Sequence, residues 1–146
     1  MPNNAPAPAA KTYEEVSLGD EASFRVTVDQ DMVRAFAALS GDMNPLHLDA
    51  GYAAGTPFKE PIAHGMIVGA LFSRLVGMHL PGRHALYLSQ TLQFREPVRI
   101  GADIIIRGVV SHKTDAHRAI TLRTTAEDGA SGKALVTGEA IVRMLR

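Results

Sequence analysis

Apolar and polar residues alternate first in a way that predicts one strand and one helix. Phe24, Val26 and Val28 are separated by polar residues, which is the two-residue period of a half-buried strand. Asp29 then stands where a helix cap is expected, and apolar residues follow at helical spacing. Gly41 is placed to end this helix, because glycine adopts the left-handed conformation common at helix ends. We therefore expect a strand followed by a helix.

The middle of the chain divides into an irregular segment and a second helix. Residues 42–61 contain three prolines and two glycines, which prevent long regular structure but permit a short helical turn near 50–54. A helix is predicted over about residues 64–79, ended by the Pro-Gly pair at 81–82. Its apolar run is interrupted by histidine, arginine and glycine, whereas a membrane span needs about 20 mostly apolar residues. We expect a buried helix.

The last part of the chain changes to strand patterns separated by turn residues. Four strands are expected: Ala85–Phe94, Asp103–Ser111, Ala119–Glu127 and Leu135–Met144. A helix followed by a run of antiparallel strands indicates an α+β fold in which the sheet wraps the helix. The length of 146 residues fits one domain, here 12–146. Residues 1–11, rich in proline and alanine, are expected to form a flexible leader.

Four small residues follow one face of the second predicted helix. Gly65, Gly69, Ser73 and Gly77 recur every four residues and form a narrow stripe. Such a stripe lets a sheet, a partner chain or a slender ligand approach the helix backbone. Packing of the helix on the sheet accounts for it equally well, so both explanations stay open.

Composition excludes several classes of function. Lys plus Arg and Asp plus Glu each number 15, whereas a nucleic-acid-binding protein usually carries a basic face. Cysteine is absent, which excludes disulfides, thiol catalysis and cysteine-ligated zinc and permits a reducing cytoplasm. The first residues lack the basic start and apolar run of a signal peptide. We expect a cytoplasmic protein without nucleic-acid or membrane partners.

Two acid–base groups stand close together in the irregular segment. Asp42 and His47 are five residues apart, and Pro45 between them biases Asn44 away from helical angles, so the chain must bend. A carboxylate and an imidazole at one point can hold a water molecule and divide proton transfers between them. The alternative is that Asp42 is simply solvated and His47 is bonded to a loop carbonyl.

The start of the second helix is a candidate for binding a developing negative charge. Its first amides have no partner within the helix, and Gly65 lacks a side chain that would block access to its N–H. This amide is suited to an oxyanion hole, although close packing also explains a glycine here. A metal site formed by His47, Asp49 and His64 is disfavoured, because this spacing matches no common ligand pattern.

These segments together resemble the MaoC-like hydratases. The resemblance rests on LSGDMNPLHLD at residues 39–49, PIAHGM at 61–66 and Phe72-Ser73, and it extends from about Val16 to Met144. More narrowly, the chain is similar to the short, single-domain (R)-specific enoyl-CoA hydratases linked to polyhydroxyalkanoate synthesis.

The resemblance implies a hot-dog fold, a homodimer, a coenzyme A thioester substrate and no metal or other cofactor. By the same resemblance, Asp42 and His47 hold the catalytic water and Gly65 supplies the oxyanion amide. Asn44 and Ser73 support the site. These assignments rest on matching motif positions.

Related activities remain as alternatives to hydration of the enoyl thioester. Dehydration of a 3-hydroxyacyl thioester is the same reaction reversed, a hot-dog thioesterase would hydrolyse the carbonyl, and a binding module would not turn the substrate over. Acyl chain length depends on which apolar residues of the second helix point inward; the candidates are Val68, Phe72, Leu75, Val76 and Leu80.

Overall fold

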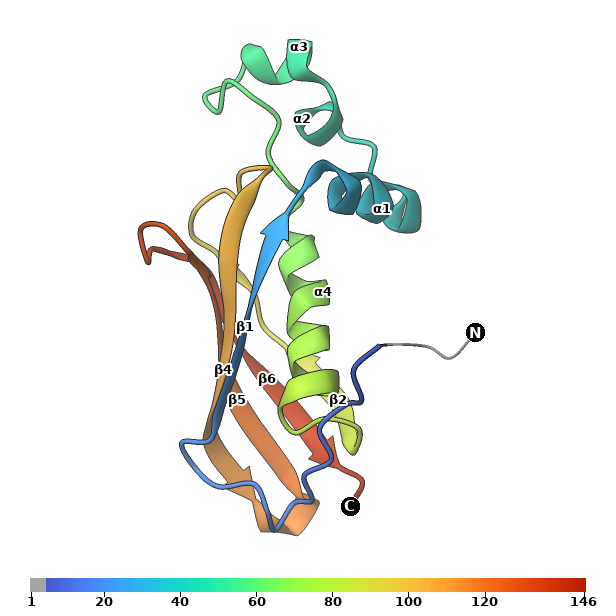
Figure 1. Ribbon diagram of the computed structural model, residues 1–146, viewed down its shortest axis with the longest axis vertical. Coiled ribbons are helices and arrows are strands. Elements are labelled where there is room, and N and C mark those ends of the chain that lie inside the picture. Colours follow the sequence, from blue (N-terminus) through green and yellow to red (C-terminus); the bar gives the residue numbers. More distant parts are fainter. Residues whose placement is uncertain (1–4) are drawn as a thin grey trace.

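One curved antiparallel sheet surrounds a central helix in the computed structural model, which describes residues 5–146 (Figure 1). The strands are β1 (Glu21–Val28), β2 (Ala85–Gln90), β3 (Gln93–Phe94), β4 (Ala102–Thr114), β5 (Ala119–Asp128) and β6 (Ala134–Met144). Their order across the sheet is β1-β4-β5-β6-β2, and β3 also pairs with β6. The strands β4, β5 and β6 pair as consecutive neighbours over most of their length, so they form the central part of the sheet.

Apart from one short turn between two strands, the helices divide between the centre of the fold and one end of the sheet. They are α1 (Gln30–Ser40), α2 (Pro45–Leu48), α3 (Ala50–Ala54), α4 (Met66–Arg74), the π-helical turn η1 (Leu75–His79) and the short η2 (Asp115–His117). Helix α4 and η1 run along the sheet, while α1, α2 and α3 lie beyond its end, near the start of α4 (Figure 1). Within residues 5–146, no helix combines the length and apolar character needed to cross a membrane.

The central helix is held by an apolar core between it and the sheet. Phe72 and Leu75 are fully buried and lie opposite Ile104 and Ile106 of β4. Burying a side chain of this size contributes roughly 1.5–3 kcal/mol. At Gly108 the helix comes especially close, because a Cβ atom there would lie 2.7 Å from Leu75 Cδ2. A larger residue at position 108 would therefore displace the Leu75 side chain.

The predicted fold class is confirmed, with two differences in the elements. Helix α4 begins at Met66, so His64 lies before the helix instead of within its first turn. The strand predicted over 85–94 is divided into β2 and β3, because the Thr91 hydroxyl accepts the Glu139 N–H at 2.9 Å. This bond replaces one that a backbone carbonyl would accept in a regular ladder.

Part of the expected leader is attached to the fold. The Ala9 N–H donates to Met78 O at 2.9 Å, and Ala9 O accepts from the Arg83 N–H at 2.8 Å. Lys11 Nζ also lies 2.8 Å from Asp20 Oδ2. The prediction of a loose segment therefore does not hold for residues 9–11, since backbone bonding to a distant turn leaves no mark in composition. Residues 1–4 lie outside the described part of the chain.

The stripe of small residues on α4 meets the sheet only at its first half. A Cβ atom at Gly65 would lie 2.7 Å from Phe94, and one at Gly69 would lie 3.4 Å from Leu92. Ser73 is exposed, and a Cβ at Gly77 would have no neighbour within 4 Å. Helix–sheet packing therefore accounts for the first two positions and leaves the other two open.

Candidate active site

The end of α1 fixes the position of Asp42. Gly41 is in the left-handed conformation, with φ 76°, and its N–H donates to Ala37 O at 2.9 Å. The Ser40 hydroxyl then accepts the Asp42 N–H at 3.1 Å and donates to Phe36 O at 2.7 Å. These bonds turn the chain sharply out of the helix, and the Asp42 side chain remains 48% exposed.

Asn44 connects Asp42 to the short helix that carries His47. Its N–H donates to Asp42 Oδ1 at 3.1 Å, and its side-chain oxygen accepts the Leu46 N–H at 2.9 Å, which caps α2. Pro45 occupies the first helical position, where its missing N–H costs no hydrogen bond. Asn44 thus both bonds Asp42 Oδ1 and caps the helix, which leaves Asp42 Oδ2 to face the site.

His47 is oriented by a bond to the segment that precedes α4. Its Nδ1 lies 2.7 Å from Ile62 O. Because a carbonyl oxygen only accepts, Nδ1 is the protonated nitrogen in this bond. Nε2 is therefore the nitrogen left to exchange protons with a bound molecule. His47 therefore bonds to a loop carbonyl, as the alternative considered for the sequence expects, while its Nε2 has no hydrogen-bond partner within residues 5–146.

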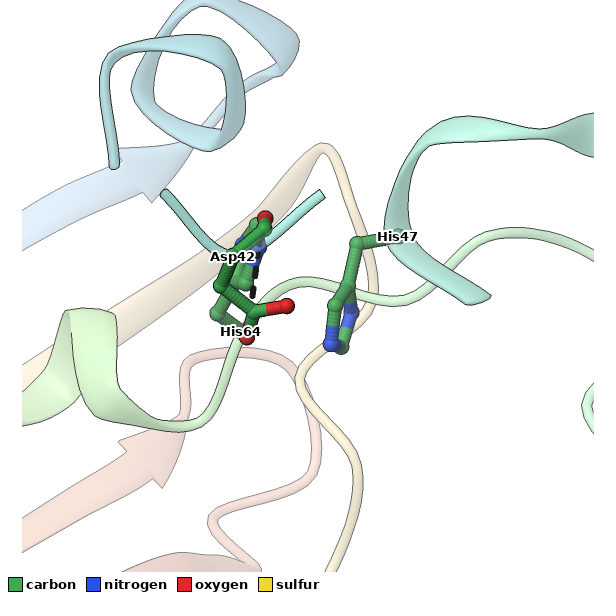
Figure 2. A group of neighbouring side chains, drawn as sticks. All are labelled: Asp42, His47 and His64. Carbon is green, nitrogen blue, oxygen red and sulfur yellow. Dashed lines mark hydrogen bonds and ion pairs between the residues drawn. The ribbon is translucent and has the colours of Figure 1, made fainter. Parts of the chain in front are cut away.

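His64 is a third member of the cluster, and sequence reasoning gave it no role here. Figure 2 shows its side chain next to those of Asp42 and His47. Its Nε2 lies 3.1 Å from Asp42 O and 3.9 Å from Asp42 Oδ2, and its ring centroid lies 3.9 Å from that of His47. The side chain is only 2% exposed. The available signal was a histidine immediately before a helix start, but sequence does not reveal the direction of its ring.

The three side chains are close enough to be considered as metal ligands. One ligand atom of each of Asp42, His47 and His64 lies within 4.8 Å of the other two, whereas Asp49 instead caps α3 by accepting the Tyr52 N–H. The set therefore differs from the one considered in the sequence. The bond from His64 Nε2 to the Asp42 carbonyl requires a proton on Nε2, so no lone pair points to a metal there. Binding an ion would require breaking this bond.

Gly65 lies at the N-terminus of α4, beside the histidine cluster. It is the N-cap residue, and within residues 5–146 its N–H has no hydrogen-bond partner. Both Gly65 and His47 line a cavity of about 400 Å³. An unpaired amide at a helix N-terminus favours bound negative charge, so this end of the cavity can hold a carbonyl oxygen that gains charge.

The remaining cavity wall is mostly apolar. It is formed by Phe58, Ile62, Ala63, Met66, Phe94, Arg95, Glu96, Pro97, Val98 and Val136. The five helix residues considered as its floor are instead buried in the core and line none of it; they are Val68, Phe72, Leu75, Val76 and Leu80. They face the sheet, while the cavity lies on the side of β3 and its following loop.

Ser73 is the one predicted site residue that a single chain does not bring to the cluster. It lies eight residues after Gly65, which corresponds to about 12 Å along a helix. Its side chain is on the exposed side of α4 and is not part of the cavity wall. Its predicted role in support of the site stays a prediction.

A long helix wrapped by one curved antiparallel sheet defines the hot-dog class. Within that class, a carboxylate and an imidazole beside a free helix-terminal amide define an acid–base site. The family model for the MaoC like domain matches residues 15–130, and the chain belongs to this family.

The relatives in this family are similar over most of the chain. An (R)-specific enoyl-CoA hydratase of Aeromonas caviae is 40% identical over 131 residues, covering 90% of this chain and 97% of that protein. One from Rhodospirillum rubrum is 39% identical, covering 89% of each chain. The solved structure of an unliganded R-hydratase of Pseudomonas aeruginosa is 41% identical, with a TM-score of 0.86, and covers 91% of this chain and 84% of that one.

Proposed function

We propose that this protein is a hydro-lyase that adds water to trans-2-enoyl-CoA to give (R)-3-hydroxyacyl-CoA, reversibly. The observation that carries the proposal is the arrangement of Asp42 and His47 beside the unpaired Gly65 amide. The similarity to (R)-specific enoyl-CoA hydratases, about 40% over nine-tenths of the chain, supports the same reaction. The proposed reaction uses no metal and no cofactor.

The proton transfers follow from the orientation of the two side chains. Water between Asp42 and His47 gives a proton to the Asp42 carboxylate while its oxygen attacks C3 of the enoyl group. His47 enters this step with a proton on both ring nitrogens and delivers the one on Nε2 to C2, because Nδ1 keeps its proton in the bond to the Ile62 carbonyl. Delivery from the same side as the attacking water makes the addition syn. The proton that Asp42 took from water then passes to His47 Nε2 and restores both groups.

Charge that develops on the thioester oxygen is held by the Gly65 N–H. A positioned acid or base contributes roughly 10²–10⁴-fold in rate. An oxyanion donor contributes about 3–4 kcal/mol. Asn44 supports the site through two hydrogen bonds, one to the Asp42 carboxylate and one that caps the short helix of His47. Ser73 is proposed to support the site from further along α4.

The direct test is to mix the protein with crotonyl-, hexenoyl- and octenoyl-CoA and follow the loss of enoyl absorbance. Product stereochemistry is then analysed by chiral chromatography. Formation of the (R)-3-hydroxy product without release of free coenzyme A is expected. Release of coenzyme A in step with substrate loss would instead identify a thioesterase.

Dehydration of a 3-hydroxyacyl thioester is the second candidate, because it is the same reaction in reverse. A 3-hydroxybutyryl-CoA dehydratase of Methylorubrum extorquens is 36% identical over 90% of this chain. Measuring both directions with matched coenzyme A and acyl-carrier-protein thioesters distinguishes the preferred carrier.

The assembly proposed for this activity is a homodimer. Within residues 5–146, β2 is the last strand of the sheet on its side, and an unpaired edge is a typical site for pairing or cover. Exposed apolar side chains on β2 support this; they are Leu86 and Leu88. Light scattering should give twice the chain mass of 15.6 kDa.

A cytoplasmic location is also proposed, and cell fractionation tests it.

A further inference from the structure

We infer that His64 is a positioning residue of this site: its imidazole holds Asp42 by the backbone and supports the ring of His47. The inference rests on the proposed function, since it assigns His64 to the same proton transfers. It concerns a side chain that contacts both acid–base groups without being placed to react itself.

The hydrogen bond at Nε2 is the first observation. Its acceptor is the backbone carbonyl of Asp42, at 3.1 Å, so Nε2 carries a proton and acts as a donor. The Asp42 carboxylate oxygen lies further away, at 3.9 Å. His64 therefore restrains the main chain that carries the base and leaves the carboxylate free for water.

The second observation is an unpaired polar atom that a structural role does not explain. His64 Nδ1 is buried and has no hydrogen-bond partner within residues 5–146. Leaving a buried polar atom unsatisfied costs about 1–3 kcal/mol. An apolar side chain would fill the same space without this cost, so packing alone does not favour histidine. The donor at Nε2 is the feature that an apolar residue lacks.

Ring contacts connect His64 to the other acid–base group. Its ring contacts that of Phe36 of α1, with centroids 4.7 Å apart, and that of His47 of α2, with centroids 3.9 Å apart. His47 is thus fixed on its edge by the Ile62 carbonyl and on its face by His64. A residue that acts by position lowers the turnover number when it is removed, because small displacements of reacting groups have large effects.

Three substitutions separate the donor from the ring. His64→Gln places its side-chain nitrogen near the position of Nε2, so it keeps a donor for the Asp42 carbonyl. His64→Phe keeps a flat ring beside His47 but has no donor. His64→Asn places its nitrogen near the position of Nδ1, where it does not reach Asp42. Hydration kinetics and thermal stability are measured for all three.

We expect His64→Phe and His64→Asn to lower kcat by about 10–100-fold with KM within about 3-fold, while His64→Gln stays within about 5-fold of the native kcat. In an Asp42→Asn background, His64→Phe should cause little further loss, because it acts through Asp42. A purely structural role would lower stability and reduce activity in proportion in either background.

Three results would overturn the inference. These are native kcat in a folded His64→Phe variant, equal losses in the Gln and Phe variants, and full additivity with Asp42→Asn. If His64→Phe does not fold, the Asn and Gln variants decide, compared at equal folded fraction. If the native protein hydrates no enoyl thioester, the proposed function fails separately. The ¹⁵N NMR shifts of His64 then still decide the geometry: an Nε2–H tautomer supports it and an Nδ1–H tautomer contradicts it.

Discussion

A histidine lies next to each end of the central helix, and the two environments differ. At the N-terminal end, the buried His64 contacts Asp42 and His47. At the C-terminal end, the ring of His79 stacks on that of Phe24 with centroids 4.9 Å apart. The guanidinium carbon of Arg74 lies over the same Phe24 ring, 4.1 Å from its centroid. Burial, and then the Arg74 charge, hold the pKa of His79 below its usual value.

The difference shows that a histidine near the central helix is defined by its partners. His64 donates to a backbone carbonyl next to a carboxylate, whereas His79 has an aromatic ring and a cation as its neighbours. A cation next to an imidazole disfavours its protonation, so His79 is poorly suited to deliver protons. We therefore expect acid–base chemistry at the N-terminal end of the helix and not at His79, and the following changes test that expectation.

The largest effect is expected from Asp42 and His47. Asp42→Asn keeps the shape and removes the base, while His47→Gln keeps polarity and removes proton exchange near neutral pH. Each change should lower the hydration rate by about 10²–10⁴-fold. The double variant should lose far less than the product of both losses, because the groups act through one water.

Thermal stability provides the control for these variants. Asp42 is half-exposed and Asp42→Asn is nearly isosteric, so its melting temperature should change little. His47→Gln gives up the Nδ1 bond to Ile62 O, so its activity is compared with that of the native protein at equal folded fraction. A structural role predicts lower stability, with activity falling only with the folded fraction. Full activity in either folded single variant would show that the proposed mechanism is wrong.

The next largest effect is expected at Gly65, where an amide is tested instead of a side chain. Gly65→Pro removes the N–H, and the native φ of −57° suits proline. Because any Cβ there would meet Phe94, both Gly65→Pro and Gly65→Ala are made in a Phe94→Ala background. The proline variant should lose at least about 10²-fold in turnover, and the alanine variant, which keeps the N–H, should lose much less.

Equal activity of these two double variants would exclude the Gly65 amide as the oxyanion donor. The Phe94→Ala protein alone serves as their reference, since Phe94 also lines the cavity. Binding of a non-reactive thioester analogue checks that the cavity still accepts the substrate.

Much of the fold was predictable because it depends on local patterns. Alternation in Phe24–Val28 and the glycine after α1 predict elements that the structure contains. The placement of Asp42 near His47 was also predictable, since Pro45 forces a bend between them. These features depend on residues close together in sequence.

Contacts between distant segments were not predictable in the same way. The ring of His64 reaches Asp42 across 22 residues, and Ala9 bonds to the turn after η1. The cavity wall was left open by the sequence, because helical periodicity identifies the apolar face of α4 but not which neighbour it faces. The sheet takes that face, and residues of β3 and its loop form the cavity instead.

A smaller effect is expected from Ser73, midway between the two ends of the helix. Ser73→Ala removes one hydroxyl, and a typical hydrogen bond contributes about 0.5–1.5 kcal/mol, or roughly 2–10-fold in rate. Since Ser73 is exposed, the melting temperature should not change. Steady-state hydration kinetics measure the effect. Native kcat and KM would remove Ser73 from the site.

The smallest effect on activity is expected from His79, which tests the other end of the comparison. Because the pKa of His79 lies below 6.5 in the folded protein, protonation favours the unfolded chain. Its contribution to stability is therefore present at high pH and is lost as pH falls below about 6.5. His79→Phe keeps an aromatic ring next to Phe24 and removes the titrating group.

For this His79→Phe variant, we expect kcat within about 2-fold of native, since His79 touches neither acid–base group. The melting temperature of the variant should fall less than that of the native protein between about pH 7 and pH 5. A large loss of kcat in the folded variant would show that acid–base chemistry is not confined to the N-terminal end of the helix.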